Sequence, residues 1–590
     1  MGIYFECNLL YNIFTKISKK GINTMKLNYK RTLFVGFAFF LICAFWQAYD
    51  GIVPLMLVNK FGLNQTWSGF IMALDNILAL FMLPLFGALS DKKDTKYGKR
   101  TPFIVMGTIL AIVCFVALTF VDNAQLNKIT AQGQDYFWQQ NYTVTNSEYD
   151  SFGNNDVEKQ YTLQDYTSMM LFNKQYDQLT DAEKQQAQNW YENISEDTVY
   201  SYDRQTNTYT VHETAPEGVK TTSAYTTLVN TARSGFAHET TQNSMWILVI
   251  FIVLLLATLI SMATFRSPAV ALMPDVTVKP LRSKANAIIN LMGTAGGMIV
   301  LVVGMLFGTG KVANQIMSYT GYVATVCGVM LVALLIFMFT VKEKKWNGEM
   351  LAQQALLDDD DTETVIANDE ENVSEVATVK VDTHEKLPKE KLKSLLLILA
   401  SVALWFIGYN AITSKYSLYA VNVLDKDYNT TLLIAQAAAI VAYIPVGIVA
   451  SKLGRKRTIL IGVALLTLSF VCAIFVTSHT PTFVIWVLFA LAGIAWATIN
   501  VNSFPMVVEL SSGGTIGKYT GYYYTASMAA QIVTPILSGA FMDLMGTMRV
   551  LFPYAALFVA LSFVTMLFVK YGDSKPETPQ SKLEMLGNDD

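Results

Sequence analysis

Long apolar runs, separated by polar stretches, dominate the pattern of hydrophobic and polar positions along the chain. Each run has roughly 19 to 27 residues, enough for a helix to cross a bilayer core of about 30 Å. The runs show no strict alternation, and only helices and closed barrels satisfy their backbone hydrogen bonds in lipid. We therefore predict an all-α multi-pass membrane protein with twelve transmembrane helices, over residues 32–58, 67–89, 102–121, 245–265, 286–307, 317–341, 395–421, 430–450, 458–476, 482–508, 520–541 and 550–569.

Lysine and arginine residues in the short loops predict the orientation of these helices. The loops after the second, fourth, eighth and tenth runs carry fourteen such residues, whereas the short loops on the other side carry four. Cytoplasmic loops are the ones enriched in Lys and Arg. We therefore expect a cell-membrane protein with both termini in the cytoplasm, at an N-terminal segment over 1–31 and a tail over 570–590.

Two long polar segments divide the helices into groups at 32–121, 245–341 and 395–569. Residues 122–244 carry seventeen Asp or Glu, seven Lys or Arg, eleven tyrosines, Trp138 and Trp190. We expect this extracytoplasmic insertion to be a small domain of mixed structure, whose aromatic side chains form a core or, alternatively, stack on sugars. Residues 342–394 are expected to form a cytoplasmic linker with an acidic centre, a flexible tether or, alternatively, a regulatory docking site.

Composition excludes several classes of protein. With 52% hydrophobic and only 15% charged residues, the chain is too apolar for a typical soluble enzyme or a disordered protein. Its net charge of −3 supplies no positive field for nucleic acid. The five cysteines form no spaced cluster, which predicts neither disulfides nor a metal site. We expect a non-enzyme that needs no cofactor, contacts membrane lipid and functions as a monomer.

The two halves of the chain repeat each other. Tyr49-Asp50 matches Tyr409-Asn410 at an offset of 360, and beyond the insertion residues 266–275 match 500–509 at an offset of 234. The drop in offset is what an insertion confined to the first half produces. A parallel repeat of six helices predicts two pseudo-symmetric bundles, and carriers built in this way bind solute between the bundles near the midplane.

Three segments resemble a known family. Residues 90–103 (SDKKDTKYGKRTPF) resemble the loop between the second and third helices of the major facilitator superfamily, in the form found in sucrose/proton symporters and glycoside–pentoside–hexuronide:cation symporters. Residues 271–275 (ALMPD), followed by Ala-Asn-Ala at 285–287, resemble the segment between helices 4 and 5 of the sucrose symporters. Residues 517–521 (GKYTG) also fit. The resemblance extends over all twelve helices but not over the insertion.

The resemblance implies a secondary active transporter that imports a sugar, a glucoside or a disaccharide such as sucrose or maltose, by proton symport through alternating access. It also implies a network of charges at the cytoplasmic ends that joins the bundles in the outward-facing state. Its expected members are Asp91, Lys99, Arg100, Arg266, Asp275, Arg455, Arg457 and Glu509. Alternatively, these charges serve only to set the topology.

The coupling residues of these relatives have no counterparts here. In the sucrose symporters an arginine directly precedes the Ala-Leu-Met stretch, where this chain has Val270, and a carboxylate lies in a helix whose equivalent here, 245–265, has no charge. The acidic pair of the melibiose-type relatives falls on Ala79 and Leu83. The coupling residues of these relatives therefore cannot be carried over to this chain. The coupling ion is expected to be the proton, with sodium as the alternative.

Three ionisable residues lie well inside the predicted spans, where each is costly. Asp50 and Asp75 lie about eight residues from the outer ends of sequence-adjacent helices, so both sit roughly 12 Å below the outer boundary. Their repeat counterparts, Asn410 and Ala435, are uncharged, so helix packing alone does not require the acids. We predict Asp50 and Asp75 as cation-coupling residues, with a structural hydrogen bond as the alternative. Lys415 is expected to extend to the interface or to pair with an acid across the bundles.

Polar and aromatic residues near the helix centres are the candidate sugar contacts. Amides donate to and accept from hydroxyl groups, and indole rings stack on the apolar face of a sugar. The substrate-binding candidates are Trp46, Gln47, Asn76, Asn290, Trp405, Asn410, Trp496, Asn500, Asn502 and Gln531. Alternatively, each of them hydrogen-bonds or packs between helices.

Two other functions fit the same pattern. The chain could be an exporter or an importer of another polar solute, or a transporter-like receptor that senses a ligand through the insertion. Accumulation of solute in vesicles separates a carrier from a receptor, because a receptor binds but accumulates nothing.

Overall fold

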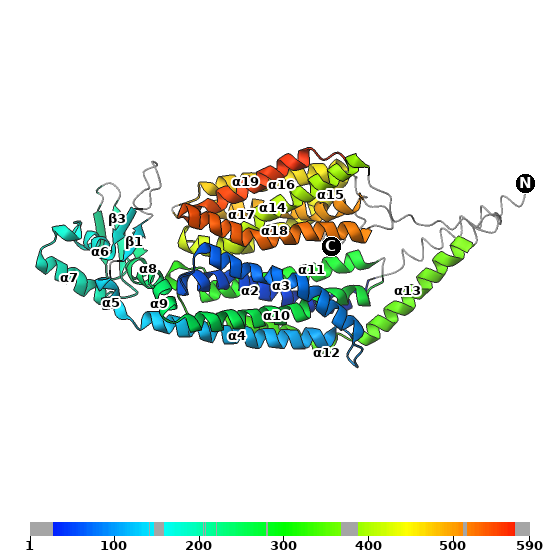
Figure 1. Ribbon diagram of the computed structural model, residues 1–590, viewed down its shortest axis with the longest axis horizontal. Coiled ribbons are helices and arrows are strands. Elements are labelled where there is room, and N and C mark those ends of the chain that lie inside the picture. The colour runs from blue at the N-terminus through cyan, green and yellow to red at the C-terminus, as the bar shows by residue number, and fades with distance from the viewer. Residues whose placement is uncertain are drawn as a thin grey trace, which may run out of the picture.

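The computed structural model describes residues 27–140, 142–146, 159–203, 206, 208–219, 221–278, 281–366, 388–478, 480–510 and 516–572. Two groups of long helices run side by side along its longest axis, with the insertion at one end and a projecting helix at the other (Figure 1). We refer to these ends as the insertion end and the linker end.

Six long helices form each bundle. The N-bundle comprises α2 (Tyr29–Leu55), extended by the π-helical turn η1 (Met56–Lys60), α3 (Gln65–Lys92), α4 (Thr101–Thr130), α10 (Met245–Val276), α11 (Arg282–Phe307) and α12 (Thr320–Thr340). The C-bundle comprises α14 (Lys389–Asn422), α15 (Tyr428–Leu453), α16 (Arg455–Ile474), α17 (Thr482–Val508), α18 (Ile516–Met545) and α19 (Leu551–Leu567). Buried apolar side chains of both bundles form one continuous core.

These helices confirm the predicted all-α membrane architecture. In the described residues, eleven helices are long and apolar enough to span a membrane, or twelve if the two parts of α15 form one bent span. Those parts, Tyr428–Tyr443 and Pro445–Leu453, meet at an angle of 50°. Pro445 explains the bend, because a proline inside a helix removes a backbone hydrogen bond and collides with the preceding turn.

The helix that follows the insertion differs from its expected bounds. The apolar run predicts an end at residue 265, whereas α10 continues to Val276 through Pro268 and Pro274. Arg266 and Asp275, expected in a loop, therefore lie within this helix.

The insertion folds as a small α+β unit at one end of the helices (Figure 1). It contains a two-stranded sheet, β1 (Thr143–Asn146) and β2 (Lys159–Thr162), and a three-stranded sheet in the order β4 (Thr208–His212), β3 (Val199–Asp203) and β5 (Thr222–Ser223). Its helical elements are α5 (Gly133–Gln139), α6 (Leu163–Phe172), η3 (Tyr176–Gln178), α7 (Asp181–Glu192), η4 (Thr226–Asn230), α8 (Thr231–Gly235) and α9 (Ala237–Asn243).

Aromatic side chains fill the interior of the insertion. Trp138, Tyr166, Tyr191 and Tyr200 are buried in one apolar cluster, and Trp190 packs against it partly buried. These aromatic residues therefore stabilise the fold of the insertion, which is the first of the two interpretations of its composition.

The start of the linker is helical rather than a flexible tether. α13 (Glu343–Ile366) projects from the linker end (Figure 1). The buried carboxylate of Glu343 accepts hydrogen bonds from the backbone N–H groups of Lys99 (2.6 Å), Arg100 (2.9 Å) and Thr101 (2.7 Å). Gly98, at φ +119°, leaves no side chain in the way of this carboxylate. The expectation of a flexible tether is thus wrong over residues 343–366; the linker's acidic residues Glu370 and Glu371 lie outside the described residues.

A buried ion pair lies at the insertion end of the N-bundle. Lys60 of η1 pairs with Asp122 of α4, and both side chains are fully buried. The Lys60 ammonium also lies 4.5 Å from the ring centre of Tyr319. The sequence does not predict this pairing, because Lys60 lies at the end of a span, where a lysine side chain is normally solvated.

Removal of one charge from this pair is expected to destabilise the protein strongly. Asp122→Asn leaves the Lys60 ammonium buried without its counter-charge, so the free energy of unfolding should fall by about 3–5 kcal/mol. Thermal melting in detergent measures this loss. Asp94→Asn is the matched control, because the ion pair of Asp94 with Lys344 is exposed and should contribute almost nothing. Equal melting temperatures for the two variants would contradict the prediction.

Candidate functional site

A cavity of about 510 Å³, the central cavity, lies between the two bundles. Six residues of α2, three of α11 and Arg266 of α10 line it from the N-bundle, and residues of α14, α15, α16, α17 and α19 line it from the C-bundle. A second cavity of about 200 Å³, the polar cavity, shares Trp46, Asp50, Arg266 and Thr413 with the first. The two cavities therefore adjoin.

The polar cavity gathers the two acids that lie within the spans. Asp50 of α2 and Asp75 of α3 both line it, together with Asn76. The Asp75 carboxylate accepts hydrogen bonds from the backbone N–H of Asn76 (2.6 Å) and from its side-chain Nδ2 (2.8 Å). The two acids come from sequence-adjacent helices and line the same small cavity. The structure thus shows the juxtaposition on which a coupling role depends; the role itself stays a prediction.

Arg266 is the main correction to the expected site. The sequence places it among the charges at the cytoplasmic end, whereas its side chain lines both cavities. Its guanidinium lies 5.6 Å from the ring centre of Trp46 and attracts the Asp75 carboxylate. An arginine inside a membrane-spanning helix needs such a partner, because removal of its charge from water is costly. Arg266 therefore belongs to the solute site rather than to a loop.

Several buried polar atoms of the cavity walls lack partners. Among the described residues, Nε1 of Trp46, Nδ2 of Asn410 and Oε1 of Gln436 are buried and have no hydrogen-bond partner. An unmade hydrogen bond of a buried polar group costs about 1–3 kcal/mol. A hydroxylated solute in the cavities would supply the missing partners, since a hydroxyl group both donates and accepts.

Aromatic rings form one wall of the central cavity. Tyr409 of α14 and Trp496 of α17 are stacked with ring centres 3.6 Å apart and an angle of 5° between their planes. The two bundles also contact each other at this cavity, where Nε2 of Gln436 (α15) donates a hydrogen bond to Oε1 of Gln47 (α2) at 2.6 Å. The wall thus presents both a flat apolar surface and amide groups.

Tyr409 and Gln436 line the central cavity but are not among the contacts predicted from the sequence. At the offset of 360, Gln436 is the counterpart of Asn76, which lines the polar cavity, so the internal repeat contains a signal for Gln436. The counterpart of Tyr409 is Tyr49, which is buried in the core, so the repeat contains no signal for Tyr409.

The ten predicted substrate contacts divide into two groups. Trp46, Gln47, Asn76, Asn410, Trp496 and Gln531 line one or both of the two described cavities. The other four, Asn290, Trp405, Asn500 and Asn502, are absent from the lining of these two cavities.

Two of these four residues are fully buried. Trp405 belongs to the apolar core, and Asn502 donates from Nδ2 to the carbonyl of Thr498 one turn earlier (3.0 Å). The structure therefore corrects their placement: both lie inside the C-bundle in this conformation.

Lys415 does not extend to the membrane interface. Its side chain is fully buried, and Nζ donates to the backbone carbonyl (2.9 Å) and to Oε1 (3.3 Å) of Gln65. Lys415 belongs to the C-bundle and Gln65 to the N-bundle, so the buried ammonium connects the two. The expectation of an interfacial lysine is wrong.

The predicted charge network forms within the bundles. Arg100 pairs with Asp91 and Asp275, all of the N-bundle, and Nε of Arg455 lies 2.5 Å from the Glu509 carboxylate in the C-bundle. The remaining members, Lys99 and Arg457, have exposed side chains. A contact of this network between the bundles stays a prediction for the outward-facing state.

The described hydrogen bonds between the bundles gather toward the insertion end. Nδ2 of Asn422 donates to Oδ1 of Asn59 (3.0 Å), and the hydroxyls of Thr309 and Tyr428 lie 2.9 Å apart. Nδ2 of Asn429 also donates to the Thr309 hydroxyl (3.0 Å). The cavities are therefore closed off from this end.

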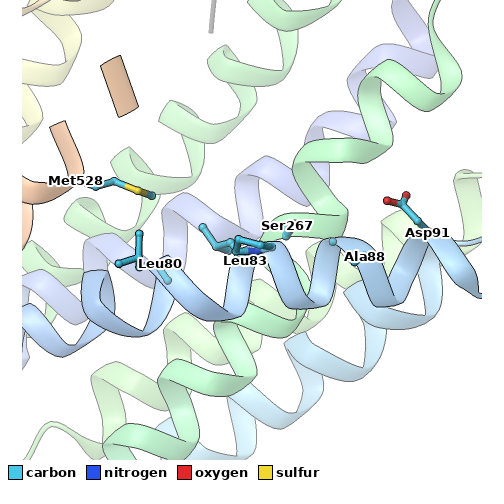
Figure 2. Close-up of a pocket in the computed structure, with 9 residues that line it drawn as sticks. Leu80, Leu83, Ala88, Asp91, Ser267 and Met528 are labelled. Carbon is cyan, nitrogen blue, oxygen red and sulfur yellow. The ribbon is translucent and has the colours of Figure 1, made fainter. Parts of the chain in front are cut away.

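Toward the linker end, a third cavity of about 580 Å³ is lined by one face of α3, by Ser267 of α10 and by Met528 of α18. Figure 2 shows Leu80, Leu83 and Asp91 along α3, with Ser267 of α10 beside them and Met528 of α18 opposite. Residues three and four apart share a helix face, so one face of α3 continues from Asp75 in the polar cavity to Asp91 at the helix end.

Family models match most of the chain. The model described as Major Facilitator Superfamily matches residues 231–442 and 426–587, and the model described as MFS/sugar transport protein matches residues 35–128. A curated relative, sucrose transport protein SUC3 of Arabidopsis thaliana, is 32% identical over 63 residues, which span 11% of each chain.

Solved structures share the fold at low identity. The inward-open xylose transporter XylE from E. coli covers 94% of this chain and 98% of its own length, with a TM-score of 0.53 and 11% identity. A bacterial homologue of the iron transporter ferroportin, in an inward-facing state, covers 92% and 99%, with a TM-score of 0.52 and 10% identity. Such different cargoes on one fold mean that the substrate must be argued from the site.

Proposed function

Because the chain belongs to the major facilitator superfamily, we propose that it is a secondary active transporter that imports a sugar together with protons by alternating access. The proposed substrate is a glucoside or a disaccharide such as sucrose or maltose. The single observation that carries this proposal is the pair of adjoining cavities between the bundles, where unpartnered indole and amide groups accompany stacked aromatic rings. These groups suit the hydroxyls and the apolar face of a sugar ring.

Proton coupling is assigned to Asp50 and Asp75. A carboxyl group that meets water on alternate sides of a membrane can bind a proton on one side and release it on the other. Arg266 is the cation that attracts the deprotonated form of Asp75, so loss of the proton and rearrangement of Arg266 are expected to be coupled. Sodium remains the alternative coupling ion.

With the insertion outside the cell, the structure corresponds to an inward-facing state. Hydrogen bonds join the bundles toward the insertion end, and toward the linker end the third cavity lies between residues of the N-bundle and Met528 of the C-bundle. The face of α3 between Asp75 and Asp91 then lines the route by which solute and proton reach the cytoplasm.

Uptake into proteoliposomes tests this proposal. Labelled sucrose, maltose, glucose and xylose are offered to vesicles with an imposed pH gradient of about two units, which supports a concentration ratio of about 100 for one coupled proton. We expect one of the disaccharides to accumulate and an uncoupler to abolish the accumulation. A sodium gradient with no pH difference is the matched control.

Three outcomes would contradict parts of the proposal. Accumulation driven by sodium alone would replace the coupling ion. Binding without accumulation under either gradient would favour the receptor, and accumulation only under the reversed pH gradient would favour an exporter.

A further inference from the structure

The first turn of α3 is held by the opposite bundle. The Asp543 carboxylate of α18 accepts hydrogen bonds from the backbone N–H groups of Gln65 (2.9 Å) and Thr66 (2.8 Å), and also from the Thr66 hydroxyl. The first N–H groups of a helix have no partner within their own helix. Asp543 therefore caps the N-terminus of α3 from across the bundle interface.

Lys415 holds the same turn from a second helix of the C-bundle. Its ammonium binds the carbonyl oxygen and the side-chain Oε1 of Gln65, while Asp543 binds the N–H of the same residue. A carboxylate at a helix N-terminus is also favoured by the helix dipole. We call the group of Gln65, Thr66, Lys415 and Asp543 the α3 latch.

The surfaces behind the latch are in tight contact. A Cβ atom at Gly539 would collide with the carbonyl oxygen of Gln65, and one at Gly69 would collide with the carbonyl oxygen of Pro535. These collisions place the backbones of α3 and α18 directly against each other. The latch thus seals a closed seam between the bundles at the insertion end.

We propose that Asp543 is a positioning residue that keeps the entrance at the insertion end closed, and that α3 must leave Asp543 before this entrance opens. This inference rests on the alternating access proposed above. The latch contacts join α3 to the C-bundle and must break when the bundles part, so their loss shifts the population toward the state that is open at the insertion end.

Alkylation of a native cysteine tests this inference. Cys43 lines the central cavity and lies seven residues before Asp50 in α2, further from the insertion end. A membrane-impermeant maleimide on the insertion side of proteoliposomes reaches Cys43 only when this entrance is open, and mass spectrometry measures the modified fraction. The background carries Cys7→Ser, Cys114→Ser, Cys327→Ser and Cys472→Ser.

Asp543→Ala is expected to raise the initial rate of Cys43 alkylation about tenfold or more, because two backbone donors and a hydroxyl lose a charged acceptor. Asp543→Asn keeps one acceptor oxygen and should raise the rate less. Glu183→Ala is the matched control, since the Glu183 carboxylate likewise accepts from a backbone N–H and a hydroxyl, both of Thr180, but within the insertion. Its rate should equal that of the parent.

A disulfide supplies the opposite test. Thr66→Cys and Asp543→Cys together place two thiols where the side chains now touch, and their oxidation should reduce Cys43 alkylation to background until a reductant is added. An Asp543→Ala rate equal to the parent's, or a disulfide that leaves the rate unchanged, would overturn the inference. The assay needs neither solute nor ion gradient, so it is independent of whether proton–sugar symport is correct.

Discussion

Asp50→Asn is expected to abolish concentrative uptake while leaving exchange intact. With a pH gradient of about two units, one coupled proton supports a solute ratio of about 100, and loss of the coupling group lowers this ratio to about 1. An amide keeps the size and hydrogen-bonding capacity of the carboxyl group but exchanges no proton. Counterflow of labelled solute in preloaded vesicles should therefore persist.

The neighbouring acid provides the comparison. Asp75→Asn keeps Asp50 but removes the carboxylate that attracts Arg266. If Asp50 carries the proton, this second variant should slow uptake without reducing the final accumulation to unity. Full accumulation by Asp50→Asn would exclude Asp50 as the coupling residue, and loss of accumulation only in Asp75→Asn would transfer that role to Asp75.

Arg266→Gln is expected to destabilise the protein and to abolish solute binding. The substitution leaves Asp75 in the cavity wall without the cation that attracts it and removes the guanidinium beside the Trp46 ring, and such interactions contribute about 0.5–3 kcal/mol to the free energy of unfolding. When Asp75→Asn is added to the same chain, both charges are gone and most of the stability should return. Thermal melting in detergent measures the first effect, and equilibrium binding of the accumulated sugar measures the second.

Arg282→Gln controls for the loss of an arginine as such. Arg282 donates to the backbone carbonyls of Thr277 (3.2 Å) and Pro274 (3.0 Å) near the linker end and does not line the two described cavities between the bundles. Strictly additive losses in Arg266→Gln and Asp75→Asn would show that the two side chains do not interact.

The architecture was predictable from the sequence because two strong signals coincide. Length and hydropathy determine the number of spans, and the offsets of 360 and 234 reveal two bundles and the place of the insertion. The depth of Asp50 and Asp75 follows from counting residues along helices of known rise. Their common cavity was therefore within reach of the sequence alone.

The ends and faces of the helices were less predictable. The predicted span ends before Arg266 because an apolar run ends at the first charged residue. In the structure α10 continues past Arg266, whose guanidinium lies beside the ring of Trp46 and is attracted by the Asp75 carboxylate inside the protein. Trp405 was expected in the solute path because it lies near a helix centre, but a membrane helix is apolar on all sides and does not reveal which face is inward.

Long-range partners explain the remaining differences. The oxygen atoms that bind Lys415 belong to Gln65, 350 positions earlier in the chain, so the residues around Lys415 contain no sign of its burial. Its depth alone suggested extension to the interface. Gln436 is the opposite case: the repeat offset already connected it with Asn76 in the polar cavity.

In the described part of the chain, the hydrogen bonds that hold the insertion go to the N-bundle. Thr241 donates to the carbonyl of Phe61 and accepts from Gln125 of α4, and Asn230 donates to the carbonyl of Ala313. Phe61, Gln125 and Ala313 belong to the N-bundle or its loops. If the bundles rotate against each other as proposed, an insertion attached to one of them magnifies the motion, so a fluorophore on α7, at the far end of the insertion (Figure 1), should move further than a residue in the bilayer. An antibody that immobilises the insertion against a surface should then slow the proposed transport cycle without contacting the cavities between the bundles.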